Sequence, residues 1–169
     1  MCVSGLWQTE NMPDRNTFLS MSDEMLARYC KLEFFKATGN GGQKRNKTSS
    51  AVRVTLEEYG VSAEDCSERS QHRNRASALN KLRRRIAYQL REEFVPFERR
   101  ECSLEHAEYP LYMAKLLDLL FSCEWDYRVA AEKMGVSSSG MLKTIARDPE
   151  LFTYYNNMRR SAGLPAVHT

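Results

Sequence analysis

A chain of 169 residues has room for one domain of ordinary size or for two small domains. Its content of 42% hydrophobic and 28% charged residues matches a soluble globular protein and excludes a fibrous or fully disordered chain. No run of about 18 apolar residues occurs, so no membrane span is expected. Residues 1–15 lack the basic and apolar regions of a secretory signal, which makes the cytoplasm the expected compartment.

The net charge of +3 conceals an uneven distribution. Residues 31–100 carry 16 Lys and Arg against 9 Asp and Glu, whereas the rest of the chain has a net charge of −4. The stretch from Arg69 to Arg91 has eight basic residues and no acidic one. Cations that neutralise phosphates bind through counterion release, so a polyanionic partner is one interpretation. On charge alone, a solvated helix face is an equally good one.

The start of the chain shows no hydrophobic period. Residues 1–20 are therefore expected to form a flexible, unstructured or loosely docked lead-in. Ser20 can then cap a short helix through Tyr29, because Asp23 and Glu24 would stabilise the first turn.

Three short strands are expected before residue 70. Alternation of apolar and polar residues predicts strands over Leu32–Lys36 and Ala51–Leu56. Between them, Thr38–Lys47 contains three glycines and no apolar side chain, which predicts a projecting basic loop. Glu58-Tyr59-Gly60 fits a turn, after which Val61–Cys66 can pair back as the second arm of a hairpin.

A helical period begins at Arg73, where apolar residues recur at the spacing of one helix face. The first half of the chain is therefore predicted to be a small β-sheet backed by a basic amphipathic helix. The apolar face consists of Ala76, Leu79, Leu82, Ile86 and Leu90, and the other faces carry Arg73, Lys81, Arg84 and Arg91.

Pro96 and the charged cluster Glu98–Glu101 predict a linker, after which the composition becomes helical. Pro110 suits the first turn of a helix that reaches about Cys123. The expected organisation is a flexible segment over 1–20, a first domain over 21–95, a linker over 96–107 and a helical domain over 108–169.

Three more helices are expected after the first. One covers Asp126–Met134 and stops at Gly135, where a left-handed C-cap is cheapest. Ser137 can cap the next, through Arg147, and Asp148-Pro149 can start a last helix that ends near Gly163. Helix-turn-helix spacing is shared by Ala130-Ala131, Gly135-Val136-Ser137, Leu142 and Ile145.

The cysteines and histidines show no metal-ligand spacing, and no metal or other cofactor is expected. The five cysteines are scattered without a C-x-x-C pair, which indicates reduced thiols. These residues are Cys2, Cys30, Cys66, Cys102 and Cys123, with His72, His106 and His168.

The predicted loop contains Gly41-Gly42-Gln43, a triplet that also recurs by chance and can mean only a flexible turn. Its surroundings make it specific. They are Gly39, Asn46-Lys47, Ser50-Ala51-Val52-Arg53-Val54-Thr55 and Glu68-Arg69-Ser70-Gln71-His72-Arg73-Asn74-Arg75-Ala76. Together these blocks resemble the peptidyl-hydrolase (GGQ) domain of class I peptide chain release factors, over roughly residues 31–90. Their spacing and the hairpin glycine Gly60 match that family as well.

The resemblance implies an α+β fold, in which a small β-sheet packs on an amphipathic helix. An α-helical, helix-turn-helix-like module is expected to follow. A factor that reads stop codons carries a further domain, for which residues 1–30 leave no room. The closer resemblance is therefore to short, codon-independent proteins that rescue stalled ribosomes. The best-known of these end in a basic tail, whereas this chain continues into predicted helices.

The family mechanism implies hydrolysis of the peptidyl-tRNA ester, with Gly41, Gly42 and Gln43 as the catalytic residues. Two adjacent glycines allow main-chain conformations that are closed to other residues. The Gln43 backbone N–H would lie near the ribose leaving oxygen, and a fixed N–H aimed at developing charge contributes several kcal/mol in a dry site. No side chain of the loop suits general-base catalysis, so the proton must move through the substrate ribose, rRNA or water.

Basic residues around the loop are implied to contact phosphates of large-subunit rRNA, which positions the domain without reading sequence. His72 is expected to be a structural hydrogen-bond partner at the loop base, because it lacks a paired nucleophile. Lys44-Arg45 replaces the family's His-Val, and Asn40 replaces its Pro or Ala, which would alter the fit. The implied nucleic-acid-binding residues are Lys44, Arg45, Asn46, Lys47, Arg53, Arg69, His72, Arg73 and Arg75.

Two functions stay open from the sequence. In the first, the chain is a peptidyl-tRNA hydrolase on stalled ribosomes or large subunits, and its C-terminal helices dock on RNA, a ribosomal protein or a rescue partner. In the second, it is a helix-turn-helix nucleic-acid-binding regulator with a non-catalytic basic adaptor domain. The second helix of that motif offers only Lys143 and Arg147 as cations. A helical cap or a dimer contact would explain the apolar stripes equally well.

Overall fold

Three short strands form an antiparallel sheet in the order β1-β2-β3. The computed structural model, which describes residues 12–36, 50–98 and 102–168, places β1 at Lys31–Phe35, β2 at Ala51–Leu56 and β3 at Val61–Asp65. A short 3₁₀ turn, η2 (Glu57–Tyr59), joins β2 to β3, and Gly60 follows it with φ +64°. The predicted strands and turn are therefore confirmed, each to within about one residue.

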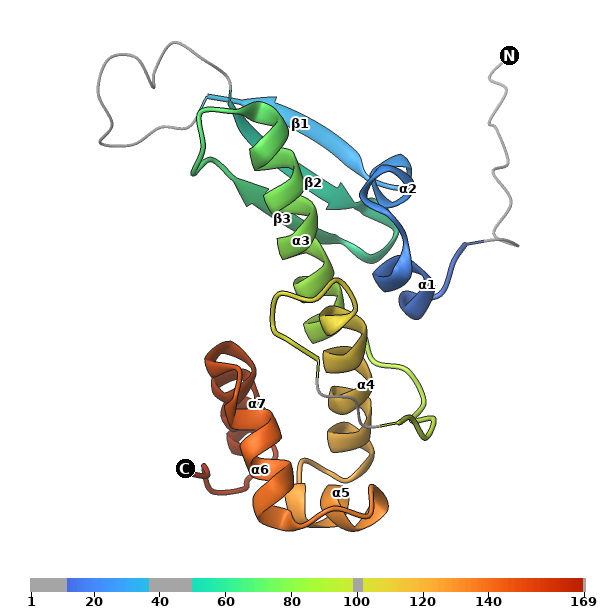
Figure 1. The fold of residues 1–169 in the computed structure, drawn as a ribbon, viewed down its shortest axis with the longest axis vertical. Helices are drawn as coiled ribbons and strands as arrows, with labels where there is room; N and C mark the ends of the chain where they lie inside the picture. Colours follow the sequence, from blue (N-terminus) through green and yellow to red (C-terminus); the bar gives the residue numbers. More distant parts are fainter. Residues whose placement is uncertain (1–11, 37–49, 99–101, 169) are drawn as a thin grey trace. The chain divides into compact units, whose positions relative to one another are not determined.

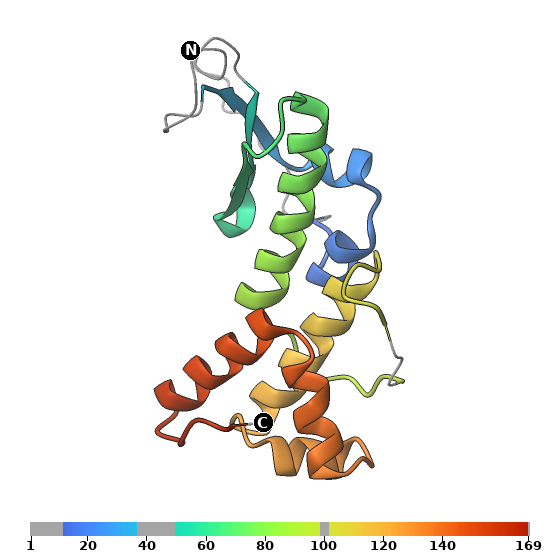
Figure 2. The ribbon, with the colours of Figure 1, turned by 60° about the vertical axis from the view of Figure 1, so that its left-hand side comes forward.

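Helix α3 (Gln71–Gln89) covers one face of this sheet, as Figure 2 shows. The strands alternate, so every second side chain of β2 and β3 points toward the helix. Burying such aliphatic side chains contributes about 1.5–3 kcal/mol each. The predicted amphipathic helix is confirmed, and it begins two residues before Arg73. The buried side chains are Val52, Val54 and Leu56 of β2, Val61 and Ala63 of β3, and Leu79, Leu82 and Ile86 of α3.

Two long cations of α3 cover the free edge of β3. The Lys81 ammonium lies 3.5 Å from the Glu64 carbonyl oxygen, and the Arg85 guanidinium donates to the Ser62 carbonyl. An edge strand otherwise presents unpaired carbonyls to other chains. The basic character of α3 therefore has a structural component as well as any role in binding.

Two short helices precede the sheet, α1 (Arg15–Ser20) and α2 (Asp23–Arg28). The expected unstructured lead-in is thus wrong for residues 15–20, where Phe18 is fully buried. The predicted cap at Ser20 is also wrong, because the Ser22 side chain accepts from the Met25 N–H and Ser20 ends α1. Residues 1–11 lie outside the described part of the chain.

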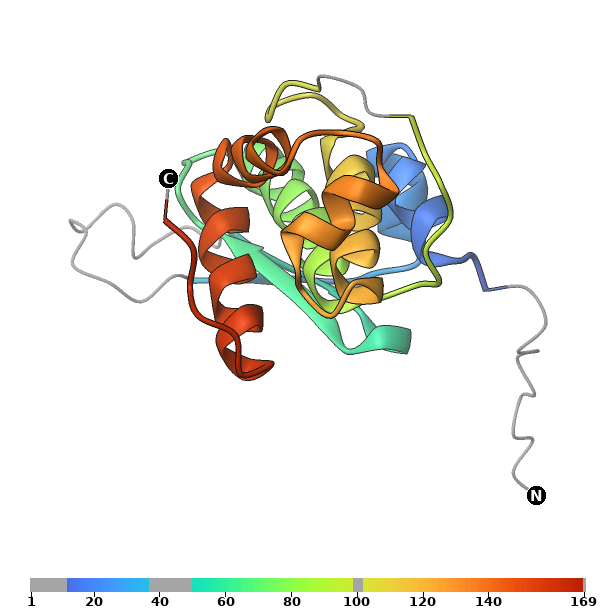
Figure 3. The ribbon, with the colours of Figure 1, turned by 90° about the horizontal axis from the view of Figure 1, so that it is seen from below.

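The chain divides into two compact units, residues 1–89 and 90–169. The second contains α4 (Tyr109–Ser122), α5 (Tyr127–Lys133), α6 (Ser138–Ala146) and α7 (Pro149–Ser161). Consecutive helices lie side by side (Figure 3). All four predicted helices are confirmed, with the expected caps at Ser137 and Asp148 and the expected left-handed Gly135. Gly163, which follows the end of α7, is left-handed as well.

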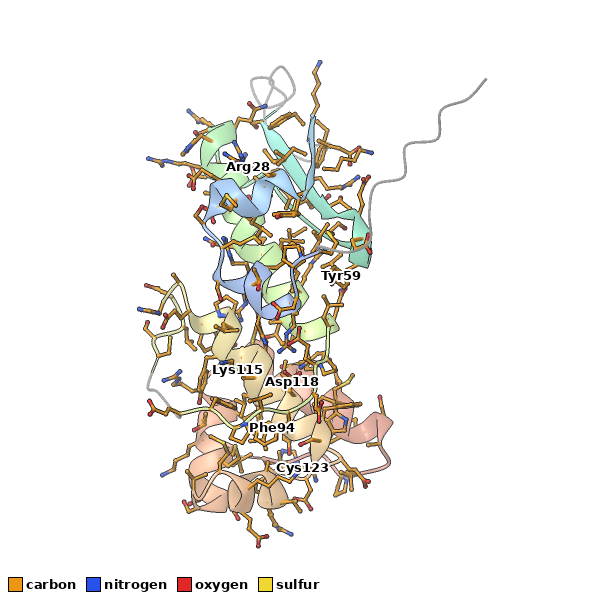
Figure 4. All side chains as sticks on the ribbon, turned by 90° about the vertical axis from the view of Figure 1, so that its right-hand side faces the viewer. Arg28, Tyr59, Phe94, Lys115, Asp118 and Cys123 are labelled. Carbon is orange, nitrogen blue, oxygen red and sulfur yellow. The ribbon has the colours of Figure 1, made fainter. Side chains whose placement is uncertain are left out.

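The segment before α4 belongs to the second unit. Arg91 donates to the Asp118 carboxylate at 3.1 Å, and the backbone N–H of Glu92 donates to the same oxygen at 3.2 Å. Figure 4 labels Asp118 together with Phe94 of this segment. Because the Asp118 side chain is only 4% exposed, the pair fixes the segment to α4.

Arg159 of α7 ties the far end of the second unit together. Its guanidinium donates to the Trp125 carbonyl at 2.6 Å and to the Pro165 carbonyl at 2.9 Å. Trp125 has φ +63°, an unfavourable conformation for a bulky residue, so the bond to its carbonyl stabilises a strained turn between α4 and α5.

The molecule is therefore an α+β protein with a three-stranded sheet in its first unit and helices in its second. None of its described helices combines the length and the apolar character that crossing a bilayer requires.

Candidate functional site

The predicted catalytic triplet, Gly41, Gly42 and Gln43, lies outside the described residues. The same holds for four of the predicted nucleic-acid contacts, Lys44, Arg45, Asn46 and Lys47. The structure does describe both ends of this loop and the side chains around its base, and from these the site can be built.

The two ends of the loop are held next to each other by the sheet. Phe35 ends β1 and pairs with Ala51, which begins β2. Arg53 and Phe35 lie on the face of the sheet opposite α3, and the Arg53 guanidinium sits 5.2 Å from the centre of the Phe35 ring. The end of β1 and the start of β2, which flank the loop segment in the sequence, are therefore adjacent in the sheet.

A buried asparagine holds the second end of the loop to the start of α3. The Asn74 amide nitrogen donates to the Ser50 carbonyl at 2.6 Å and to the Glu68 carbonyl at 2.9 Å. Its amide oxygen accepts from the Glu68 N–H at 2.9 Å. Asn74 has no exposed surface, so these hydrogen bonds are shielded from water. The end of β1, the start of β2 and the first turn of α3 consequently lie at the same end of the first unit (Figure 1).

Beside this anchor, the Asp65 carboxylate fixes the connection from β3 to α3. It accepts from Ser67 N–H at 2.7 Å, from the Ser77 hydroxyl at 2.5 Å and from the Lys81 ammonium at 2.6 Å. Burial by itself would raise the pKa of Asp65, but the hydrogen bonds from Lys81, Ser67 and Ser77 overcome it and hold the pKa well below the usual range. Asp65 is therefore a structural anion at neutral pH.

The five described members of the predicted nucleic-acid set lie on the elements that form the loop base. Arg69, His72 and Arg73 are exposed in the connection to α3 and in its first turn, Arg75 follows half-buried, and Arg53 is exposed on β2. Nothing in their placement conflicts with phosphate contact, which stays a prediction.

Several of these cations face glutamates of the same unit. Arg53 donates to Glu64 at 2.8 Å, and Arg73 lies 3.9 Å from Glu68. Exposed pairs of this kind contribute about 0–1 kcal/mol, so an incoming phosphate can displace them at small cost.

The charges of Arg75 and His72 act on Glu24 of α2. Hydrogen bonds from its own backbone N–H and from the Ser22 hydroxyl lower the pKa of Glu24, and the charges of Arg75 and His72 lower it further.

Sequence reasoning did not find Asn74 or Asp65 as site residues. The signal was present for Asn74, which falls on the same helix face as the buried Ala78 and Leu82. A polar residue on an apolar stripe must find partners when it is buried.

No group of three or more His, Cys, Asp or Glu side chains gathers as a metal site within the described ranges. Burial raises the pKa of the Cys30 thiol to about 11, so this cysteine is not a nucleophile at neutral pH.

Comparison with known proteins identifies the family. A family model described as RF-1 domain matches residues 22–108, which is more than half of the chain. The chain belongs to the RF-1 domain family. Among curated relatives, peptide chain release factor 1 of Thermotoga maritima is 49% identical over 63 residues, which is 37% of this chain and 18% of that protein.

Other curated relatives are also peptide chain release factors. Peptide chain release factor 1 of Erythrobacter litoralis is 44% identical over 63 residues, covering 37% of this chain and 18% of its own. Peptide chain release factor 2 of Paramagnetospirillum magneticum is 47% identical over 57 residues, covering 34% and 15%. The similarity thus spans less than a fifth of these relatives, and it concerns the RF-1 domain that contains the loop and its base.

Proposed function

We propose that this protein releases nascent chains by hydrolysing the ester of peptidyl-tRNA on ribosomes that have stalled, or on separated large subunits, without reading a stop codon. The observation that carries the proposal is the loop base of an RF-1 domain: Phe35 paired with Ala51, and Ser50 bonded to Asn74. This base fixes both ends of the segment that contains Gly41-Gly42-Gln43.

The chemistry follows from what such a segment offers. Attack of water on an ester carbonyl passes through an oxyanion, and a fixed backbone N–H directed at the developing charge lowers the barrier. In our proposal the Gln43 N–H is that donor, and Gly41 and Gly42 permit the main-chain conformation. Proton transfer is left to the substrate ribose, to rRNA or to water, so the active site is completed by the ribosome.

The distribution of charge supports RNA binding through the first unit. Residues 1–89 carry 15 Lys and Arg against 10 Asp and Glu, whereas residues 90–169 carry 10 against 12. Counterion release favours docking of the first unit on rRNA phosphates, with Arg53, Arg69 and Arg73 beside the loop.

The same count argues against the alternative of a helix-turn-helix regulator. A DNA- or RNA-reading unit is normally cationic, and this one has a net charge of −2. Of the two cations on the second helix of the motif, Arg147 donates to the Cys102 carbonyl at 2.5 Å. We therefore propose that the helical unit meets a ribosomal protein or a rescue partner rather than nucleic acid.

The Gly42→Ala variant tests the enzymatic proposal. Peptide release is measured on ribosomes stalled on truncated mRNA, on ribosomes with a stop codon in the A site, and on isolated large subunits loaded with peptidyl-tRNA. The variant is expected to bind ribosomes normally and to lose release by about 100-fold or more, the scale seen when an oxyanion donor is displaced. Gly140→Ala, the same exchange within α6, is the matched control. Its Cβ would lie 3.0 Å from the capping Ser137 hydroxyl, so its folded fraction is measured by circular dichroism, and its release per folded molecule should be normal. Unchanged release by Gly42→Ala would refute the proposal.

A further inference from the structure

Asn74 uses both amide hydrogens and its amide oxygen in hydrogen bonds at the loop base. Its two amide hydrogens go to the Ser50 and Glu68 carbonyls, and its oxygen takes the Glu68 N–H. Asp would lack the donors, Ser would lack the reach, and Gln would carry an additional methylene into a site with no exposed surface. The arrangement is therefore specific to asparagine.

The position of Ser50 gives this anchor its importance. The ladder between β1 and β2 ends at the pair of Phe35 and Ala51. Ser50, the residue before that pair, is bonded through its carbonyl to α3 by way of Asn74. Ser50, the residue of the described chain that borders the segment containing Gly41-Gly42-Gln43, is thus held by α3 and by the β3–α3 connection.

We propose that Asn74 is a positioning residue for peptide release. It holds the Ser50 peptide group so that the main chain of the loop reaches the ester with the required orientation. Asn74 does not touch the substrate itself. This role rests on the proposed function, because it concerns the same loop and the same reaction.

The inference predicts a separation of kcat from KM that a purely structural role would not give. Misplacing reacting groups by about 1 Å can cost about 100-fold in rate without weakening binding. If Asn74 only stabilises the fold, its loss lowers the amount of folded protein, and each folded molecule stays fully active. If Asn74 positions the loop, the folded molecules themselves are slow.

The experiment compares Asn74→Ala, which removes all three bonds, and Asn74→Asp, which keeps the acceptor and removes both donors, with Ile86→Ala. Ile86 is buried on α3, and its 12-residue separation from Asn74 corresponds to about 18 Å of helix. Release is measured with the full chain on stalled ribosomes, and rates are divided by the folded fraction from circular dichroism.

Both Asn74 variants are expected to lose about 10- to 100-fold in kcat with KM changed less than about twofold. Ile86→Ala should keep kcat despite a comparable or larger fall in its urea midpoint. If the Asn74 variants had the same kcat per folded molecule as Ile86→Ala, the positioning role would be refuted and the proposed function would stand. A wild-type protein that releases no peptide would refute the proposed function first, and the positioning role with it.

Discussion

The Asp65 carboxylate offers a direct test of how the loop base is supported. Its side chain is 2% exposed and takes hydrogen bonds from Ser67, Ser77 and Lys81, the last at 2.6 Å. The perturbation is Asp65→Ala, which leaves these donors without their acceptor at the junction of β3 and α3.

The expected loss of unfolding free energy follows from these contacts. Removing one member of a buried pair costs about 3–5 kcal/mol. The Lys81 side chain is 53% exposed and can regain water, so the lower end applies. The Ser67 backbone N–H and the hydroxyl groups of Ser67 and Ser77 still lose a charged acceptor. Each such bond contributes about 1.5–3 kcal/mol, before water replaces the carboxylate. We expect a net loss of about 3 kcal/mol for the first unit.

The pH dependence has a defined sign. The pKa of Asp65 is lower in the folded than in the unfolded protein, so the unfolded state binds the proton more readily. The stabilisation is complete well above the ordinary pKa of about 3.9 and is lost as pH falls through that value toward the folded pKa. Asp65→Ala should therefore differ most from wild type at neutral pH and least in acid.

Hydrogen exchange in increasing urea, read by mass spectrometry on peptides from 51–89, measures this loss within the first unit. Peptides from the second unit serve as an internal reference. Glu64→Gln is the matched control, because Glu64 is the adjacent carboxylate but is 53% exposed, and it should cost less than about 1 kcal/mol. Equal exchange in the two variants, or an Asp65→Ala effect that grows in acid, would refute the reasoning.

Two further predictions concern the turn of the hairpin and the cations beside the loop. Gly60→Ala should destabilise the first unit by about 1–2 kcal/mol in urea unfolding. A Cβ at Gly60 would meet no atom within 4 Å, so the cost comes from the φ of +64° alone. Gly60→Asn should cost less, because Asn tolerates this conformation better than Ala. If Arg69 binds a phosphate, Arg69→Gln should make the slope of log ribosome affinity against log salt concentration shallower by roughly 1. Arg53→Gln should change the slope less, because Arg53 already bonds Glu64. Slopes equal to that of the wild type in both variants would remove both residues from the interface.

Local signals in the sequence predicted most of the helices and strands. Ser137 and Asp148 cap α6 and α7 as expected, since their side chains accept from backbone N–H groups of the first turn. Gly135 ends α5 in a left-handed conformation for an equally local reason. Such boundaries depend on a few neighbouring residues, so they can be read without tertiary structure.

Helix α1 could not be predicted in this way. Its six residues are too few to form a helix from propensity, and it is stabilised by packing of Phe18 against Tyr29 and Tyr59, at ring-centre distances of 5.4 and 6.0 Å. The failure to predict α1 also explains why the cap was predicted at Ser20. Ser20 and Ser22 are both good capping residues, and the choice of Ser22 follows from α1 occupying Ser20.

The residues of the candidate site also differ in whether a local sequence pattern can indicate them. The proposed catalytic triplet is contiguous, so a sequence motif can indicate it, whereas Asn74 bonds to Ser50, which is 24 positions away. No local pattern connects these two residues. What the sequence does contain is a conflict: Asn74 shares a helix face with Ala78 and Leu82, where burial of an unpaired amide would be costly. Such a conflict indicates that a partner must exist, but only the packing of α3 on the sheet identifies it as the end of the loop.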